Sequence, residues 1–269
     1  MTAPATGRRS RLWRGLAELP PGLGPQVVTI GVFDGVHRGH ARLIDRTLDV
    51  GRALRLPSML VTFDPHPARV VGAPRDTAAL STVDRRAELA WRHGVDGVCV
   101  LSFTEELARL SPEAFVERIV VGALRAAAVV VGVNFTFGHQ ASGDLAMLRR
   151  LGAQHDVDVH GVELLPAADG RTPCSSTHIR TCLARGDVEG ATRALGRPHR
   201  VEGIARMVGW RTGALTVEPG TALPAPGSYR ARLSTGGTTF VQITAHGQLL
   251  IRTPALPPGP AGLDFLSRA

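Results

Sequence analysis

Lysine is missing from this sequence. All 31 basic residues of the 269-residue chain are arginine, and 23 acidic residues leave a formal net charge of +8. Without an ε-ammonium group the chain cannot anchor pyridoxal phosphate as a Schiff base, and it can have neither a P-loop lysine nor the lysine of a protein kinase. Phosphate groups must therefore be bound by arginine, histidine, hydroxyl or backbone N–H groups.

Aromatic residues are also scarce, at 4% of the chain. Single-stranded RNA is bound by stacking its bases on aromatic side chains, and the sequence contains no aromatic-rich stripe. We attribute the positive charge to an arginine-rich composition and expect no nucleic-acid partner.

Cysteines and long apolar runs are few. The longest sustained apolar stretch, Ala126–Val131, is far shorter than the roughly 20 residues of a membrane-spanning helix. The three cysteines, Cys99, Cys174 and Cys182, are odd in number and lack zinc-site spacing, which favours a reduced compartment. The N-terminal residues lack the apolar core of a secretory signal. We expect a cytoplasmic protein without a membrane partner.

Strands alternate with helices between residues 26 and 198, after a lead over residues 1–25 that we expect to be flexible. Apolar runs predict buried strands at Gln26–Phe33, Pro57–Phe63, Val95–Leu101, Ala127–Val131 and Val157–Leu164. Helices are predicted at Arg38–Leu54, from Ser81 to Gly94, from Ser111, at Gly143–Leu151 and from Ser175. This order predicts an α/β fold with a parallel sheet, whose ligands bind beyond the carboxyl ends of the strands.

The pattern changes over residues 199–269. Short apolar segments separated by Gly and Pro turns predict strands at Val201–Val208, Ala214–Val217, Tyr229–Leu233, Thr238–Thr244 and Leu249–Arg252. We therefore expect a small all-β second domain, with Tyr229 and Phe240 in its core.

The first chemical motif is Gly31–His40 (GVFDGVHRGH), which follows a predicted strand and opens a helix. His37 and His40 are three residues apart and share one face of the first helical turn. Gly39 allows close approach to the backbone, and Gly31 and Gly35 permit a sharp turn. A helix N-terminus attracts phosphate, and imidazoles there can follow charge that develops on a transferred phosphoryl group. A metal-binding pair or two solvent-facing histidines remain alternatives.

The second motif is Ser175–Arg180 (SSTHIR), again at the start of a predicted helix. Hydroxyls at a helix start commonly serve only as caps. However, Arg180 lies one turn beyond Ser176, so hydroxyl, N–H and guanidinium groups could converge on one polyphosphate.

The chain resembles the bacterial bifunctional riboflavin kinase/FAD synthetase family from about Val28 to Gly203. The resemblance rests on four motifs in order: GVFDGVHRGH with its HxGH signature, TFDPHP (62–67), VVVGVNFTFG (129–138), and SSTHIR with LARGDVEGATRALGRP (183–198). It implies a Rossmann-like nucleotidylyltransferase domain over residues 26–198, followed by a riboflavin-kinase-like β-barrel over 199–269. It also implies FMN adenylyltransferase activity, which makes FAD and pyrophosphate from FMN and ATP.

The resemblance also implies roles for individual residues. Three would be catalytic, by contacting the ATP phosphates: His37, His40 and Arg180. The nucleotide site would be lined by Gly31, Phe33, Asp34, Gly39, Ser176 and Thr177. The flavin side would include His66, Asn134 and Phe137, although these three could instead be a structural turn residue, a turn cap and a core residue. Mg²⁺ would arrive with ATP, and no protein ligand for it is assigned.

The kinase half departs from the family pattern. The stretch Gly209–Leu215 (GWRTGAL) stands where the family has a GFPTAN motif; its Thr212 remains, but Ala214 replaces the asparagine. Gly259 occupies the position of a catalytic glutamate, four residues before Leu263-Asp-Phe, and the family's C-terminal helix is absent. A glycine cannot act as a general base, so we expect riboflavin phosphorylation to be lost and the barrel to remain as a structural or docking module. Cys174 departs more mildly, from an aliphatic residue.

Two other functions stay open. The chain could transfer a nucleotidyl group to another phosphomonoester, such as a modified flavin or a specialised metabolite. It could also be a non-catalytic flavin or RNA binder. Nothing in the sequence indicates the oligomeric state.

Overall fold

The structure, a computed structural model, describes residues 11–74, 76–168 and 170–269. Its contacts divide the chain into two units, each assembled from separate segments. The first consists of Met1–Phe33, Gly39–Arg75 and Val83–Leu164. The second consists of Asp34–Arg38, Asp76–Thr82 and Leu165–Ala269.

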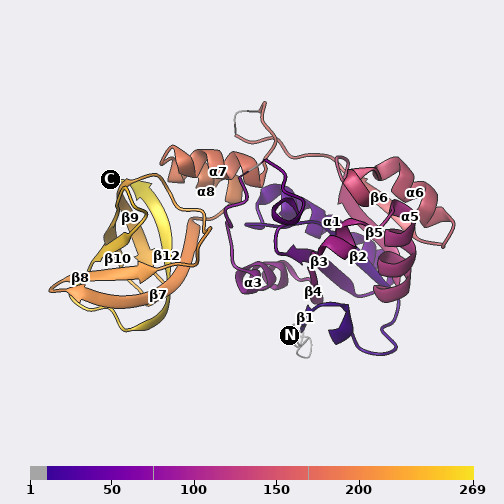
Figure 1. Ribbon diagram of the computed structural model, residues 1–269, viewed down its shortest axis with the longest axis horizontal. Helices are drawn as coiled ribbons and strands as arrows, with labels where there is room; N and C mark the ends of the chain where they lie inside the picture. The colour runs from indigo at the N-terminus through magenta and orange to yellow at the C-terminus, as the bar shows by residue number, and fades with distance from the viewer. Residues whose placement is uncertain (1–10, 75, 169) are drawn as a thin grey trace, which may run out of the picture. The chain divides into compact units, whose positions relative to one another are not determined.

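A six-stranded parallel sheet forms the centre of the first unit (Figure 1). Every residue of its central strand β2 is buried, as expected for a parallel sheet covered on both faces. The strands, in spatial order, are β1 (Arg11–Arg14), β4 (Gly97–Ser102), β3 (Ser58–Asp64), β2 (Gln26–Ile30), β5 (Ala126–Gly132) and β6 (Asp158–Val162).

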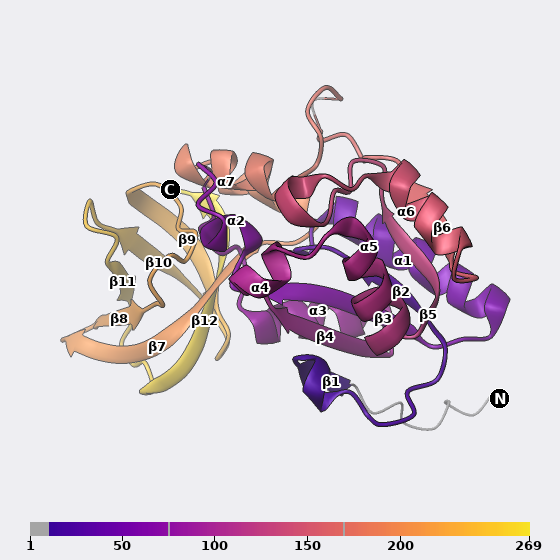
Figure 2. The same cartoon turned by 45° about the vertical axis from the view of Figure 1, so that its right-hand side comes forward.

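Helices cover both faces of this sheet (Figure 2). On one face, Val50 of α1 (Arg38–Leu54) packs with Val27 and Ala128. On the other face, the wide helix η2 (Val116–Ala123) and α6 (Leu145–Ala153) cover Val28 and Val129. The shorter elements are η1 (Leu16–Glu18), α2 (Pro67–Val70), α3 (Val83–His93), α4 (Glu105–Ala108), α5 (Pro112–Phe115) and η3 (His139–Ala141).

The strand order places the predicted motifs at one edge of the sheet. From β2 the chain proceeds through β3 to β4 in one direction, and then through β5 to β6 in the other. Such a reversal beside β2 is a topological switch point, where α/β proteins bind ligands beyond the carboxyl ends of the strands. The loops that follow β2 and β5 leave from the carboxyl ends of these strands. The first loop carries the Gly31–His40 motif, and the second carries the end of the 129–138 motif.

Local signals predicted several of these elements. The helix expected at Arg38–Leu54 is observed with those bounds. The Ser111 Oγ atom accepts the N–H of Ala114 at 3.2 Å and caps α5, which confirms the predicted helix start.

Strand β1 was not predicted, and the expectation of a flexible lead over residues 1–25 is wrong for Arg11–Arg14. These residues pair with β4 along Gly97–Val100. Gly97 makes the pairing possible, because a Cβ atom at this position would lie 2.5 Å from the Trp13 ring. Residues 1–10 lie outside the described residues.

The second unit contains two helices and a closed antiparallel barrel (Figure 1). The helices are α7 (Ser176–Ala184) and α8 (Val188–Leu195), which share one apolar core with the barrel strands. The strands, in order around the barrel, are β10 (Thr238–Ile243), β11 (Leu249–Arg252), β8 (Thr212–Thr216), β7 (His199–Gly209), β12 (Gly259–Arg268) and β9 (Gly227–Leu233). A Rossmann-like α/β sheet together with a small β-barrel is the predicted fold class; the domain boundary at 198/199 stays a prediction.

The barrel core corrects two expectations. Strand β12 was not predicted, yet its Leu263 and Phe265 are fully buried. Tyr229 meets Phe265 edge to face at a centroid distance of 5.5 Å, which confirms its place in the core. The prediction for Phe240 is wrong: its side chain is 54% exposed, because neighbouring side chains in a strand alternate and Val241 takes the inward position.

Replacing the two phenylalanines therefore has different expected effects on stability. We expect Phe265→Ala to lower the free energy of unfolding by about 3–5 kcal/mol, because it leaves a cavity in the barrel core. We expect Phe240→Ala to change it by less than about 0.5 kcal/mol, as for other surface positions. Urea denaturation of both variants measures the difference, and equal losses would contradict the assignment of the two side chains.

Within the described part of the chain, no helix is both long enough and apolar enough to cross a membrane.

Candidate functional site

The loop after β2 brings three residues of the first motif together in the first unit. Phe33 is fully buried, and its ring lies 5.0 Å from the His40 ring, measured between centroids. Gly31 lies beside it, and a Cβ atom there would approach the Phe33 ring to 3.2 Å, so the ring would have to shift by a few tenths of an ångström. His40 lies in the first turn of α1, so Phe33 packs against the second histidine of HxGH.

Asp34 anchors the same loop in the second unit. Its carboxylate is 2% exposed and accepts the N–H groups of Leu80 and Ser81 at 3.0 and 3.1 Å. Nη2 of Arg180 donates to Oδ2 of Asp34 at 2.6 Å. The Ser81 hydroxyl accepts the N–H of Gly35 at 2.9 Å. Asp34 thus joins the loop, the 76–82 segment and α7.

Arg180 and Ser176 converge on Asp34. The guanidinium of Arg180 is buried, with 6% of the side chain exposed, and its Nε atom donates to the Ala78 carbonyl at 2.7 Å. The Ser176 hydroxyl donates to the backbone oxygen of Asp34 at 2.9 Å. Two members of the second motif are therefore bonded to protein groups, and their contacts with phosphate stay predictions.

Two hydroxyl groups at the start of α7, those of Ser175 and Thr177, have different surroundings. The Oγ atom of Ser175 accepts the N–H of His178 at 3.2 Å and is the N-cap. Thr177, in the first turn, is exposed. The capping role that the sequence left open belongs to Ser175, and the contact of Thr177 with phosphate stays a prediction.

His37 lies directly before α1 and is 5% exposed. Its Nδ1 atom is 3.9 Å from the Sγ atom of Cys174, which donates to the Ala194 carbonyl at 3.3 Å. Burial, and then the positive charges of Arg197 and Arg180, lower the pKa of His37 from 6.5 to about 3. The imidazole is therefore neutral at physiological pH and has one N–H to donate.

Two buried histidines make stability depend on pH. The pKa of His199 is lowered by burial from 6.5 to about 4, and that of His37 to about 3. Because the unfolded chain binds these protons more readily, the stabilisation is present above pH 6.5 and is lost as the pH falls toward 4. We expect urea midpoints to fall steadily from pH 7 to pH 5. A midpoint unchanged over this range would contradict the neutral state of both side chains.

The remaining predicted residues lie in the first unit. His66 caps α2, because its Nδ1 atom accepts the N–H of Ala68 at 3.1 Å. Asn134 is exposed after β5, beside Gly132. Phe137 is buried and stacks on Phe135 at a centroid distance of 5.7 Å. The structural tasks considered for His66 and Phe137 are thus present, and the contacts of all three residues with flavin stay predictions.

Arg197 was not predicted as a site residue. Its Nη1 atom donates to the carbonyls of Val36 and Leu195 at 2.9 and 3.2 Å, and Nη2 donates to the carbonyl of Gly35. The available signal was its place in the LARGDVEGATRALGRP motif, directly after Gly196, whose φ of 75° ends α8.

The described residues do not supply a metal site of their own. They contain no group of three or more His, Cys, Asp or Glu side chains arranged to hold an ion. Asp34, the buried carboxylate of the loop, is bonded to Arg180. Mg²⁺ binds commonly through substrate phosphates and retained waters, and its arrival with ATP stays a prediction.

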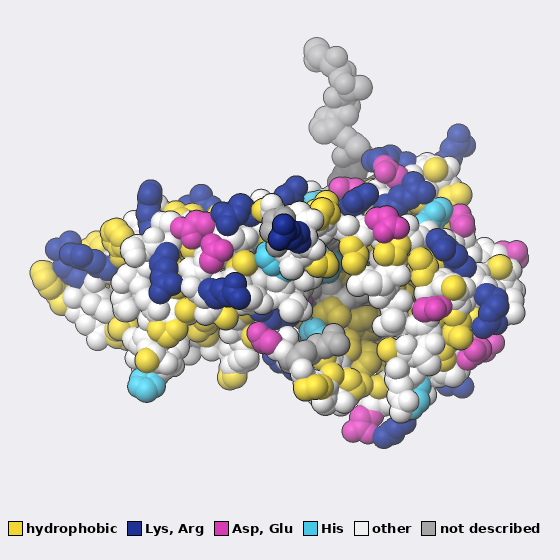
Figure 3. Space-filling view, turned by 90° about the horizontal axis from the view of Figure 1, so that it is seen from above, with side chains coloured by type: hydrophobic (Ala, Val, Ile, Leu, Met, Phe, Trp, Pro, Cys, Tyr) yellow, Lys and Arg dark blue, Asp and Glu magenta, His cyan; other side chains and the backbone are white. Residues whose placement is uncertain are grey.

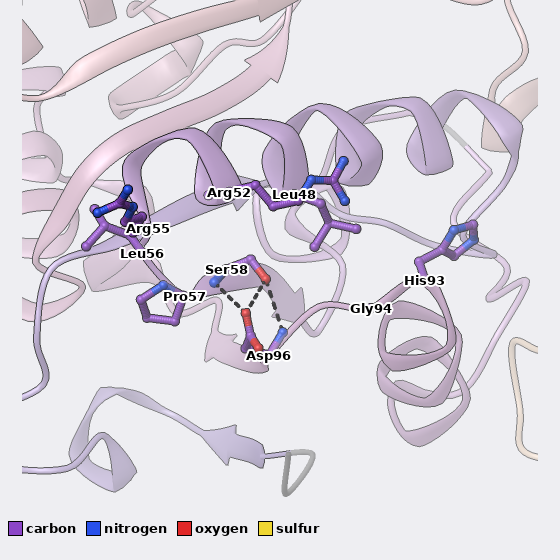
Figure 4. Close-up of a pocket in the computed structure, with 10 residues that line it drawn as sticks. Leu48, Arg52, Arg55, Leu56, Pro57, Ser58, His93, Gly94 and Asp96 are labelled. Carbon is purple, nitrogen blue, oxygen red and sulfur yellow. Dashed lines mark hydrogen bonds between the residues drawn. The ribbon is translucent and has the colours of Figure 1, made fainter. Parts of the chain in front are cut away.

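A pocket of about 600 Å³ lies at the amino ends of the strands, opposite the end of the sheet that carries the motifs (Figure 4). Its walls come from the end of α1 and from the chain entering β3, and they include Leu48, Arg52 and Pro57. Within it, Asp96 accepts hydrogen bonds from the backbone and hydroxyl groups of Ser58, at 2.9 and 2.8 Å. This pocket lies away from the carboxyl ends of the strands and holds none of the predicted site residues.

Comparison with known proteins agrees with the motifs. Residues 20–178 match the family model of FAD synthetase. The bifunctional riboflavin kinase/FMN adenylyltransferase of Pseudomonas fluorescens is 34% identical over 245 residues, which are 88% of this chain and 74% of the relative. The enzyme of the same name from Listeria monocytogenes is 30% identical over 230 residues, 82% of this chain and 72% of the relative.

A solved structure supports the fold. A Streptococcus pneumoniae protein, titled a macrolide-efflux protein, superimposes with a TM-score of 0.82. The match covers 97% of this chain and 90% of that protein at 21% sequence identity, so it supports the architecture alone. The match to the family model and the 34% identity to the Pseudomonas fluorescens enzyme show that the chain belongs to the FAD synthetase family.

Proposed function

We propose that this protein is an FMN adenylyltransferase, with the reaction carried by residues 26–198. A phosphate oxygen of FMN attacks the α-phosphorus of ATP, a new P–O–P bond forms, and the bond to pyrophosphate breaks. The products are FAD and pyrophosphate. The observation that supports this most is His37, a neutral imidazole at the N-terminus of α1, flanked by the charges of Arg180 and Arg197.

No side chain has to act as a nucleophile in this reaction, so the protein contributes position and charge. His37 and His40 donate hydrogen bonds to the phosphates at the first turn of α1. Thr177 and the N-terminus of α7 receive the outer phosphates. Arg180 supplies positive charge while Asp34 fixes its orientation. When bound with ATP, Mg²⁺ shields the negative charge of the phosphates.

The test is direct synthesis. Pure protein incubated with FMN, ATP and Mg²⁺ should produce FAD and pyrophosphate in equal amounts, as measured by chromatography and a pyrophosphate assay. Parallel reactions with CTP and with other phosphomonoesters define the nucleotide and the acceptor. Retained ATP binding without turnover of FMN would instead favour transfer to another phosphomonoester.

We propose that the barrel no longer phosphorylates riboflavin. Gly259 begins β12 with a φ of 126°, a conformation that disfavours any side chain, and it provides no carboxylate. Residues 199–269 contain three acidic side chains: Asp264 is paired with Arg200 at 2.7 Å, Glu202 accepts a hydrogen bond from Thr82, and Glu218 is exposed. A general base is therefore absent from the position where the family pattern has one.

Riboflavin, ATP and Mg²⁺ should accordingly give no FMN and no FAD. The same preparation must convert added FMN to FAD, which shows that it is folded and active. Appreciable formation of FMN from riboflavin would overturn the proposed loss of the kinase.

The face drawn in Figure 3 bears on the remaining alternative, a non-catalytic RNA binder. Arginine side chains on this face are interspersed with acidic ones and do not form a continuous stripe. Nucleic-acid sites concentrate their positive charge in such stripes. A strong affinity for RNA that falls steeply with salt would revive this alternative.

A further inference from the structure

Arg197 joins the end of α8 to the loop that carries His37. Helix α8 ends at Gly196, whose N–H donates to the Thr192 carbonyl. Its left-handed conformation turns the chain at this point, with a φ of 75°. From there the guanidinium reaches the carbonyls of Leu195, Val36 and Gly35. One side chain thus holds a helix end and two consecutive peptide groups of the loop.

Of these two residues, Val36 is the strained one, because glycine adopts positive φ readily. Gly35 has a φ of 78°, and Val36 has a φ of 38°. A β-branched residue with positive φ is a steric outlier, and it persists only where its surroundings hold it in place. Hydrogen bonds from Arg197 to the Gly35 and Val36 carbonyls provide that support, and His37 is the next residue.

The positive charge of Arg197 also acts on His37. The groups identified around His37 are Arg197, Arg180 from α7, and Cys174 just before α7. After burial, the charge of Arg197 is the largest influence that lowers the pKa of His37. An arginine at this position therefore favours the neutral form of the ring as well as its placement.

We propose that Arg197 is a positioning residue for His37, which holds the strained Gly35–Val36 turn so that the imidazole stays at the start of α1. The proposal deepens the proposed adenylyl transfer and rests on it. Arg197 acts through His37 and needs no contact with ATP or FMN.

Two substitutions distinguish the hydrogen bonds that Arg197 makes to the loop from the effect of its positive charge. Arg197→Gln removes both the charge and most of the donors, whereas Arg197→Lys retains the charge but cannot fork to several carbonyls. The matched control is Arg193→Gln on the same helix, whose side chain is 60% exposed and lies 3.9 Å from Asp187. Circular dichroism confirms that each variant is folded.

Kinetics provide the first measurement. We expect kcat for FAD formation to fall about 10²-fold in both Arg197 variants with little change in the KM for ATP, because displacing a reacting group by about 1 Å costs this much. Arg193→Gln should match the wild type. If the folded Arg197 variants retain the wild-type kcat, or if only KM rises, the proposal is overturned.

Nuclear magnetic resonance provides a measurement that needs no turnover. The His37 ring signal, among ten histidines, is assigned by its absence in His37→Ala. Its pKa should rise toward 6.5 in Arg197→Gln and stay low in Arg197→Lys and Arg193→Gln. An unchanged His37 pKa in Arg197→Gln would overturn the link between the two residues. If the wild type makes no FAD, the proposed function fails, while this titration still decides whether Arg197 controls His37.

Discussion

His37→Ala should lower kcat for FAD formation by about 10²–10³-fold, the usual effect of removing one positioned donor from a developing negative charge. His37 is 5% exposed at the start of α1, and its neutral ring has a single N–H to donate. Because this donor acts mainly when charge develops on the transferred phosphoryl group, the KM for ATP should change far less than kcat. Initial rates at saturating FMN over a range of ATP concentrations measure both constants.

His246→Ala is the matched control, since this histidine is exposed and follows β10 in the barrel. It should retain the wild-type rate. Equal rates for folded His37→Ala and the wild type would remove His37 from the mechanism. A loss confined to KM would assign it to ground-state binding instead.

The second large effect concerns stability. Asp34→Ala should lower the free energy of unfolding by about 3–5 kcal/mol, the range observed when one partner of a buried ion pair is removed. The guanidinium of Arg180, 6% exposed, would remain buried without its carboxylate. The N–H groups of Leu80 and Ser81 would lose their acceptor as well. Urea denaturation at pH 7 measures the loss.

A double-mutant cycle isolates the ion pair. Arg180→Met combined with Asp34→Ala should cost less than the sum of the two single changes, because no charge is then left unpaired. The control is Asp84→Ala, which breaks an exposed pair with Arg14 whose side chains are 75% and 52% exposed. Such surface pairs contribute about 0–1 kcal/mol. If Asp34→Ala cost no more than Asp84→Ala, the anchoring role of Asp34 would be wrong.

The fold was predictable where its signals are local. The helix at Arg38–Leu54 follows from its periodic apolar residues, and the cap at Ser111 follows from the Ser-Pro-Glu order. Strand β1 was not predicted because its four residues, with an arginine at each end, form no apolar run. Its pairing also depends on a glycine far away in the sequence, Gly97. Strand β12 was not predicted because it begins in a Gly- and Pro-rich stretch. Which of its residues are buried is determined only by its pairing with β7 and β9.

The candidate site was predictable as a set of residues but not as a set of contacts. The motifs predict His37, Ser176 and Arg180 as phosphate contacts, and the sheet order shows that the first motif follows β2 at the switch point. The pairing of Arg180 with Asp34 joins residues 146 positions apart. No periodicity or spacing encodes such a contact, and the same holds for Arg197 and the loop before His37.

The discontinuous make-up of the second unit has a consequence for biosynthesis. Asp34–Arg38 belongs to a unit otherwise built from Asp76–Thr82 and Leu165–Ala269. At a translation rate of about 5–20 residues per second, Asp34 waits roughly 7–30 s for Arg180 to be synthesised. The His37 loop is therefore among the last parts of the nascent chain to reach its final conformation. A chain interrupted before α7 would lack Arg180 and Ser176, two of the partners of Asp34, so the C-terminal part of the chain is needed to complete the loop that carries His37.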